Sequence, residues 1–171
     1  MGSGKSTLGR LVNRFTGIDF IDLDSYIENR HHKSVKEIFS EKGEEGFRII
    51  ERDLLREVSA IENVIIACGG GTPCFFDNME IMNQAGNTVW LNAPLSLLHS
   101  RLMRGRHKRP LIADLDSEQL TEFIIRALDK RKPYYSKALY RFDTALLENE
   151  EDRELTAKRF ISQFLPGYDQ R

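Results

Sequence analysis

The sequence has few features of a secreted or membrane-bound protein. Its 171 residues include only two cysteines, Cys68 and Cys74, which cannot build a disulfide framework and which fit a reducing compartment. No apolar run approaches the ~18 residues of a membrane-spanning helix. The segment Met1–Thr7 also lacks the apolar stretch of a secretion signal. We therefore expect a cytoplasmic protein with no membrane contact.

An excess of charge is also absent, because 25 Lys and Arg against 26 Asp and Glu give a net charge of −1. This balance argues against broad nucleic-acid binding. The one dense basic stretch, 101–109, contains five cations but no interleaved aromatic residue for base stacking. No Cys/His spacing resembles a metal cage. We expect no nucleic-acid partner, and we interpret the basic stretch as a mobile lid that closes over a polyphosphate.

The sequence does have the alternation of an α/β protein. Apolar residues at helical spacing predict helices over 5–16, 47–61, 77–85, 95–102, 120–128 and 157–165, with Asp116 or Ser117 capping the fifth. Short apolar runs predict buried strands at 18–23, 64–68, 88–91 and 142–147. A composition of 40% apolar and 30% charged residues is sufficient for one core at this length. We therefore predict one domain built on a parallel sheet.

The strongest local signal is the run Gly2-Ser3-Gly4-Lys5-Ser6-Thr7 ahead of the first helix. Glycines let backbone N–H groups converge on a phosphate, a lysine at the helix start reaches the β- and γ-phosphates, and a hydroxyl binds Mg²⁺. Lys5 and Ser6 occupy those two positions. The full pattern GxxxxGK[ST] would place its first glycine one residue before Met1, so a flexible Gly/Ser tail is the alternative interpretation.

Two carboxylates lie at the end of the first expected strand. Asp22 and Asp24 are spaced i, i+2, so in an extended segment they project from the same side. At the carboxyl edge of a parallel sheet they would face a nucleotide. One could bind Mg²⁺ through water while the other accepts the proton of a substrate hydroxyl. A turn that caps a helix over 25–29 is the alternative.

A triple glycine and two arginines point to a small anionic substrate. The glycines at 69–71 follow a buried strand and let a ligand approach the backbone closely, although a sharp turn would also use one or two of them. Arg48 has Glu51 at i+3 to fix its guanidinium, and Arg131 precedes a Pro-Tyr-Tyr run. Guanidinium groups bind carboxylates bidentately. Taken alone, each arginine is more often a solvated surface residue.

These motifs occur together in one family: the chain resembles shikimate kinase. The resemblance rests on GSGKST (2–7), DLD (22–24), FRIIE (47–51), GGGT (69–72), RPLI (109–112) and RKPYY (131–135), which span nearly the whole chain. Many nucleotide-binding proteins share the first motif. The aspartate pair, the FRxxE pattern, the triple glycine and the RPL lid together are much more specific.

The resemblance implies a P-loop NTPase-type three-layer α/β/α fold with parallel strand order 2-3-1-4-5. Residues 1–171 would form a single kinase domain and a monomer, with a shikimate-binding helical region at 25–61 and a lid loop at 104–114. The family's first strand, the central one, and the first glycine of the phosphate motif are not in this sequence. We therefore expect the natural chain to begin roughly ten residues upstream, about the length of one strand and its turn.

The resemblance also implies ATP- and Mg²⁺-dependent phosphorylation of the 3-hydroxyl of shikimate, on the route to chorismate and the aromatic amino acids. Catalysis would use Lys5, Asp24 and Arg109. Shikimate would bind to Asp24, Arg48, Gly70, Gly71 and Arg131, and Mg²⁺ to Ser6 and Asp22. ATP would bind to Gly2, Ser3, Gly4, Lys5, Ser6, Thr7, Arg109 and Arg104, the last stacking on adenine. The acidic segment 148–152 lacks the expected proline, so no adenine contact is carried over to it.

Two other functions share part of this pattern. A gluconate-type sugar-acid kinase or a nucleoside monophosphate kinase would need Lys5 and Ser6, but not Arg48, the triple glycine and Arg131 around one carboxylated ring. An inactive nucleotide-binding homologue without the first strand is the second alternative. Intact Lys5, Asp24 and Arg109 argue against an evolved loss of catalysis.

Overall fold

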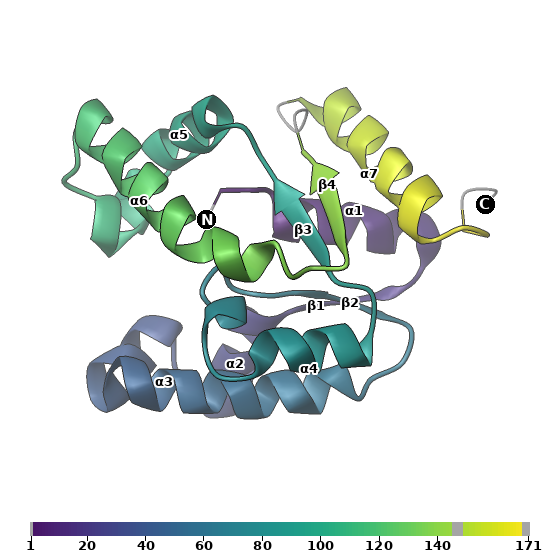
Figure 1. Ribbon diagram of the computed structural model, residues 1–171, viewed down its shortest axis with the longest axis horizontal. Coiled ribbons are helices and arrows are strands. Elements are labelled where there is room, and N and C mark those ends of the chain that lie inside the picture. Colours follow the sequence, from purple (N-terminus) through teal and green to yellow (C-terminus); the bar gives the residue numbers. More distant parts are fainter. Residues whose placement is uncertain (1, 145–148, 169–171) are drawn as a thin grey trace.

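The computed structural model describes residues 2–144 and 149–168, and its strands form two parallel pairs (Figure 1). β1 (Asp19–Asp22) pairs with β2 (Val64–Ala67), from Asp19 opposite Val64 to Asp22 opposite Ala67. β3 (Val89–Asn92) pairs with β4 (Tyr140–Asp143), from Val89 opposite Tyr140 to Asn92 opposite Asp143. The helices are α1 (Lys5–Thr16), α2 (Leu23–His31), α3 (Val35–Ser59), α4 (Asn78–Ala85), α5 (Leu95–Arg104), α6 (Ser117–Tyr135) and α7 (Glu150–Phe164).

The structure confirms the predicted alternation of helices and strands and changes several boundaries. α3 begins at Val35, well before the predicted start, and passes through a kink at Gly43, where φ is 69°. The last predicted strand, 142–147, is observed as Tyr140–Asp143, and 145–147 lie outside the described residues. Asp116 is the N-cap of α6: its carboxylate accepts the backbone N–H groups of Glu118 and Gln119, both at 2.9 Å.

Helices cover both faces of the strands. In β2, Ile65 packs with α1 and α7 against Val12 and Phe142, whereas the adjacent Ile66 packs against the α2–α3 cluster around Leu55. Successive strand side chains point to opposite faces, so both faces of β2 are covered. The result is the three-layer α/β/α arrangement that the family resemblance implied. None of the described helices has the length and apolar character needed to cross a membrane.

Close contact between α1 and β1 depends on a glycine. A Cβ built on Gly9 would lie 2.1 Å from the nearest ring carbon of Phe20, so only hydrogen fits there. α1 is bounded by two glycines in the left-handed region, Gly4 (φ 92°) and Gly17 (φ 76°). The Gly17 N–H donates to the carbonyl of Asn13 and ends the helix. These glycines fix where the helix begins, where it ends and how near it lies to the sheet.

The carboxyl ends of three strands meet at the start of α1. Asp22 ends β1 beside Lys5, Gly69 follows β2 beside Asp24, and Thr144 follows β4 with its hydroxyl 3.4 Å from the carbonyl of Ser3. Ligands of parallel α/β sheets bind at this edge. The fold therefore concentrates the predicted site residues at one end of the strands.

A cavity of about 1160 Å³ separates the two strand pairs and extends to this edge. Its walls include consecutive residues of β2 (Val64–Ala67) and of β3 (Val89–Asn92). The pairs β1–β2 and β3–β4 correspond to 2-3 and 4-5 of the expected strand order. The cavity lies between these two pairs, against β2 and β3.

Candidate active site

The loop Gly2–Gly4 leads directly into α1 and has the backbone of a phosphate-binding turn. Gly2 (φ 75°) and Gly4 (φ 92°) both lie in the left-handed region, and helical residues begin at Lys5. The first N–H groups of a helix have no partner within the helix, and the helix dipole adds partial positive charge there. The loop is thus suited to an anion such as a phosphate.

Lys5, Ser6 and Asp22 form a cluster at the end of β1. The Ser6 hydroxyl donates to Asp22 Oδ2 at 2.5 Å, and the Lys5 ammonium lies 3.5 Å from the same oxygen. Burial acts to raise the pKa of Asp22, but the Ser6 hydrogen bond, the Lys5 charge and further hydrogen bonds together hold it below its ordinary value. Asp22 is therefore an anion that fixes the lysine and the hydroxyl relative to each other.

Asp24 lies in a different local structure from the one expected. The extended i, i+2 geometry is wrong: α2 begins at Leu23, so Asp22 is its N-cap and Asp24 is in its first turn. The helix still brings Asp24 into the site, because a Cβ on Gly69 would lie 3.1 Å from Asp24 Oδ1. Burial raises the pKa of Asp24; the Lys5 charge opposes this, and Asp22 and Glu51 add to it. A raised pKa suits a proton acceptor.

The buried carboxylate of Glu51 joins Arg48 to the glycine loop. Glu51 is 1% exposed and accepts hydrogen bonds from Arg48 at 2.7 Å and from the Thr72 hydroxyl at 2.6 Å. The guanidinium of Arg48 also lies 4.1 Å from the ring centre of Phe75. A Cβ on Gly71 would lie 2.7 Å from Arg48 Nη2, so the guanidinium is packed against the loop backbone.

Arg131 approaches the same loop from the end of α6. It is half-buried and lines the cavity together with Asp24 and Gly70. Burial raises the pKa of the Cys74 thiol, and the positive charges of Arg131 and Arg48 both counter this. Arg131 and Gly70 line one cavity, and Arg48 is packed against the adjacent Gly71. Guanidinium groups near two neighbouring positions of one loop are suited to binding a small carboxylate.

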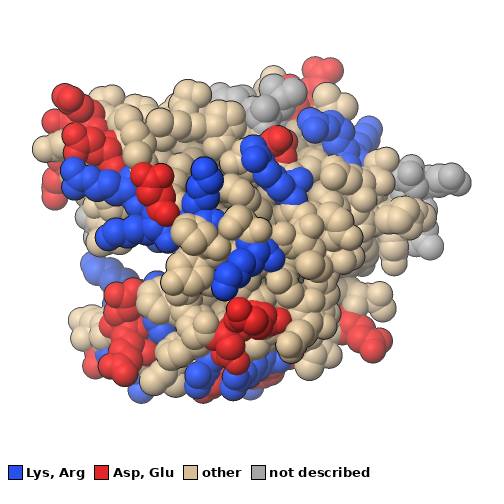
Figure 2. Space-filling model, viewed as in Figure 1, with Lys and Arg blue, Asp and Glu red and all other residues tan. Residues whose placement is uncertain are grey.

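The segment 104–114, expected to be a lid, begins at the end of α5 and contains Arg104 and Arg109. Two short 3₁₀ helices, Arg106–Lys108 and Pro110–Ile112, replace the expected open loop, and Ile112 is fully buried against α5 and α6. Arg109 donates to the carbonyl of Gly105 at 3.0 Å, and Arg104 to the carbonyl of Ser100 at 3.3 Å. Both arginines line the cavity. Figure 2 shows blue Lys and Arg side chains around a notch at the left, between the α5–α6 region and α3.

A family model described as shikimate kinase matches residues 1–164. The chain belongs to the shikimate kinase family. It is 48% identical over 159 residues to a shikimate kinase of Bacteroides thetaiotaomicron, covering 93% of this chain and 91% of the relative. It is 49% identical over 152 residues to that of Parabacteroides distasonis, covering 89% and 88%.

Solved shikimate kinases have the same fold. The crystal structure of the Bacteroides thetaiotaomicron protein is similar with a TM-score of 0.91 at 47% identity, covering 95% of this chain and 93% of the other. The shikimate kinase of Acinetobacter baumannii, solved in complex with shikimate, has a TM-score of 0.80 at 30% identity, covering 95% and 88%. The fold described above is therefore that of the shikimate kinase family.

Four further residues join this site that the motifs did not single out. Arg101 from α5 donates to the carbonyl of Gly2 at 3.1 Å, and Thr144 after β4 approaches the carbonyl of Ser3. Thr72 contacts Glu51, and the Tyr135 hydroxyl donates to the carbonyl of Gly70 at 2.6 Å. Thr72 and Tyr135 belong to the GGGT and RKPYY motifs, so the sequence could have identified them as site residues. Arg101 belongs to the basic stretch 101–109, whereas nothing in the sequence pattern marks Thr144.

Proposed function

We propose that this chain transfers the γ-phosphoryl group of ATP to the 3-hydroxyl of shikimate. The observation that carries the proposal is the position of Asp24 between two charged groups. Asp24 lines the same cavity as Lys5, at the phosphate-binding loop, and lies beside Gly69 together with Glu51, which fixes Arg48. This transfer requires a proton acceptor that lies between the site for the ATP phosphates and the site that binds the carboxylate of the substrate.

The phosphate side of the site uses the residues around Lys5. The backbone of Gly2–Thr7 and the ammonium of Lys5 would hold the phosphates of ATP, with Arg104 against the adenine and Arg109 reaching the transferred group. These groups neutralise charge that develops on the phosphoryl oxygens. Closure of residues 104–114 would exclude water, which suppresses hydrolysis of ATP.

The substrate side uses Asp24 and the two arginines. Arg48 and Arg131 would bind the shikimate carboxylate, and Gly70 and Gly71 would line the ring. Asp24 would take the proton of the 3-hydroxyl as that oxygen bonds to the γ-phosphorus, while the bond from the γ-phosphorus to the β-γ bridging oxygen breaks and ADP leaves. The raised pKa of Asp24 supports this role because it makes the carboxylate a better base.

The donor atoms of Ser6 and Asp22 fit Mg²⁺. A hydroxyl and an ionised carboxylate are hard oxygen ligands, and this ion takes only a few protein ligands beside phosphate oxygens and water. When bound, Mg²⁺ supplies positive charge to the phosphates. Ser6 and Asp22 would hold it, and their hydrogen bond already brings the two groups together.

The wider organisation belongs to the same proposal. Residues 1–171 would act as a single kinase domain, with residues 25–61 around shikimate, as a cytoplasmic monomer without a nucleic-acid partner. The segment 148–152, for which no adenine contact was carried over, begins outside the described residues.

A coupled ADP-release assay with ATP and Mg²⁺ tests the function. We expect turnover with shikimate and none with gluconate or nucleoside monophosphates. Turnover with gluconate alone would identify a sugar-acid kinase. No turnover with any acceptor, together with ATP binding, would identify an inactive homologue.

A further inference from the structure

Tyr135 ties the end of α6 to the glycine loop. It is the last residue of α6, and its hydroxyl donates to the carbonyl of Gly70, 65 positions earlier in the chain, at 2.6 Å. Burial raises the pKa of the phenol, so it stays protonated and remains a donor at neutral pH. This is a direct bond between the helix that carries Arg131 and the loop that would line the substrate.

The position of Arg131 depends on that end of α6. Arg131 and Tyr135 are spaced i, i+4 and therefore lie on one face of the helix. Pro133 lies between them and has no N–H, so the backbone bond it would make to the preceding turn is missing. The last turn is thus held less firmly by its own backbone, and a side-chain contact has more influence on it.

The same loop is fixed on its other side by Arg48. The guanidinium of Arg48 is packed so closely against Gly71 that a Cβ there would lie 2.7 Å from it. Gly70 contacts Tyr135 and Gly71 contacts Arg48, so two adjacent glycines contact the two arginine-bearing helices. The hydrogen bond to Gly70 therefore links the helix that carries Arg131 to the loop that contacts Arg48.

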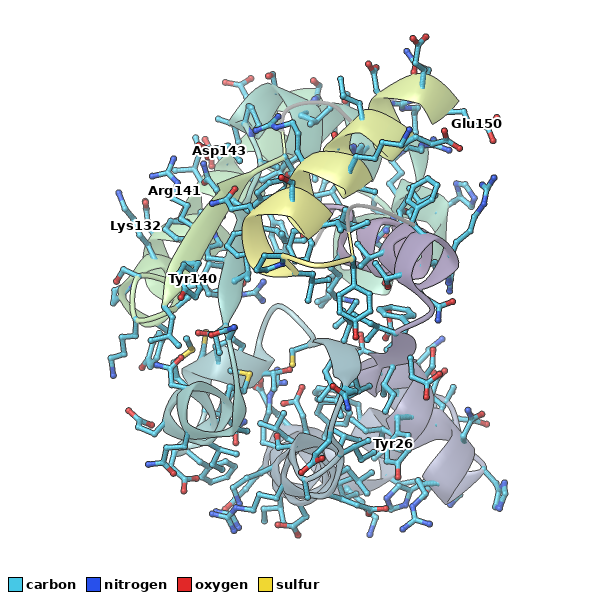
Figure 3. All side chains as sticks on the ribbon, turned by 90° about the vertical axis from the view of Figure 1, so that its right-hand side faces the viewer. Tyr26, Lys132, Tyr140, Arg141, Asp143 and Glu150 are labelled. Atoms are coloured by element: carbon cyan, nitrogen blue, oxygen red, sulfur yellow. The ribbon has the colours of Figure 1, made fainter. Side chains whose placement is uncertain are left out.

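An aromatic contact braces the Tyr135 ring and supplies a probe. The ring centre lies 5.9 Å from that of Trp90 on β3, and the guanidinium of Arg141 lies 5.4 Å from the Trp90 ring on its β4 side. Figure 3 shows Arg141 and Lys132, from β4 and the end of α6, along one side of the molecule. Trp90 is the only tryptophan of the chain, so tryptophan fluorescence reports on the surroundings of this one ring.

We infer that Tyr135 is a positioning residue for recognition of the substrate carboxylate, acting through Arg131. This inference rests on the proposed function. Loss of the phenol hydroxyl would free Gly70 from the end of α6 and would let Arg131 move relative to Arg48. Binding of the carboxylated substrate would weaken, while the phosphate-binding loop at the other side of Asp24 would be unaffected.

The test compares Tyr135→Phe with Tyr134→Phe, which removes the hydroxyl of the exposed neighbouring residue. We expect Tyr135→Phe to raise the KM for shikimate about 10-fold, as expected when one buried hydrogen bond is lost. The kcat should change by less than about 3-fold, the KM for ATP should be unchanged, and Tyr134→Phe should behave as the wild type. Titration of Trp90 fluorescence with shikimate should show the same shift in affinity.

A double-mutant cycle with Arg131→Ala distinguishes positioning from a general structural role. If Tyr135 acts through Arg131, Tyr135→Phe should weaken shikimate binding much less in the Arg131→Ala background. Thermal melting of every variant shows whether the fold is retained. Additive effects in the cycle, or equal loss of ATP binding, would overturn the inference. If the wild-type chain does not phosphorylate shikimate, both the proposed function and this inference are wrong. If the wild type is active and Tyr135→Phe has a normal KM for shikimate, only the inference is wrong.

Discussion

The carboxylate of Glu51 accepts a hydrogen bond from the guanidinium of Arg48 at 2.7 Å, and their side chains are only 1% and 13% exposed. Arg48 has a second carboxylate neighbour, Glu44, at 3.4 Å, but that side chain is 63% exposed. Water screens an exposed pair, whereas a buried charge whose partner is removed is left uncompensated. The two glutamates contact one arginine and differ mainly in burial.

The difference in burial predicts that substitution of Glu51 has a large effect and the matched substitution of Glu44 has little. Glu51→Gln should raise the KM for shikimate by about 10-fold and lower the Tm, because Arg48 and Thr72 lose the charged acceptor that aligns them. Glu44→Gln should leave both quantities near their wild-type values. Steady-state kinetics and thermal melting of the two variants measure this. Equal effects from both would show that the short contact with Glu51 does not orient Arg48.

Asp24→Asn should abolish most of the activity. Removing a proton acceptor from the transition state is expected to lower kcat by at least ~10²-fold, while the Kd for ATP should change little because Lys5 and its loop remain. Asp53→Asn is the control, since the Asp53 side chain is 60% exposed on α3. A variant with near-normal kcat and altered ATP binding would assign Asp24 to the nucleotide instead.

The same substitution should stabilise the fold at neutral pH. The pKa of Asp24 is raised by burial, so the folded state binds its proton more tightly than the unfolded chain does. Stability therefore falls as the pH rises from the ordinary aspartate value of 3.8 through the raised folded value. Above that window the ionised Asp24 costs stability, which a neutral Asn avoids. The Tm of Asp24→Asn should exceed that of the wild type at pH 7 and converge with it in acid; an equal or lower Tm at pH 7 would contradict this sign.

Asp22 should show the opposite dependence on pH. Its pKa is held below 3.8 by the Ser6 hydrogen bond and the Lys5 charge, which outweigh the effect of burial. Its contribution to stability is thus fully present above the unfolded value and is lost as the pH falls through the folded value. We expect Asp22→Asn to lower the Tm at pH 7 and to flatten the acid part of the Tm profile. A variant whose profile parallels that of the wild type would show that the cluster around Lys5 is not electrostatically coupled.

Much of this site could be predicted from the sequence because its residues lie in short motifs with local geometry. A lysine at a helix start, a glutamate at i+3 of an arginine and a run of glycines have the same relations in the sequence as in the fold. Asp24 lies beside the glycine loop, but its backbone is helical where the sequence predicts an extended one, since a chain that leaves a strand can continue either way. Thr144 and Arg101 meet the phosphate loop only through tertiary packing, and no local pattern encodes such contacts.

Gly9 offers a test of how closely α1 must approach β1. Gly9→Ala would place a methyl carbon 2.1 Å from a ring carbon of Phe20, so the helix or the ring must move, at a cost of about 1–3 kcal/mol. For a domain of this size that lowers the Tm by roughly 2–10 °C. Gly86→Ala is the control, because its backbone is extended (φ 175°) and nothing lies within 4 Å of the new carbon. Similar Tm values for both variants would mean that the contact between α1 and β1 is loose.

The cavity between β2 and β3 leads to the last prediction. Residues of both strands line it, α1 and α7 close it on one side, and Gly2 lies on its wall beside Leu98 and Leu102. A parallel strand inserted there would be buried on both faces, so it should consist of consecutive apolar residues. Each such side chain would contribute about 1.5–3 kcal/mol on burial, and its backbone would pair with the facing strands.

We therefore expect an extension of about seven Val, Ile and Leu residues, fused ahead of the present sequence, to raise the Tm of the chain by 10 °C or more, as a rough estimate. A Gly/Ser extension of equal length is the matched control, because it adds the same chain without apolar surface. Hydrogen exchange should show new protection of backbone amides in β2 and β3 in the apolar form alone. Equal melting temperatures and equal exchange for the two extended chains would show that the cavity does not accept a strand.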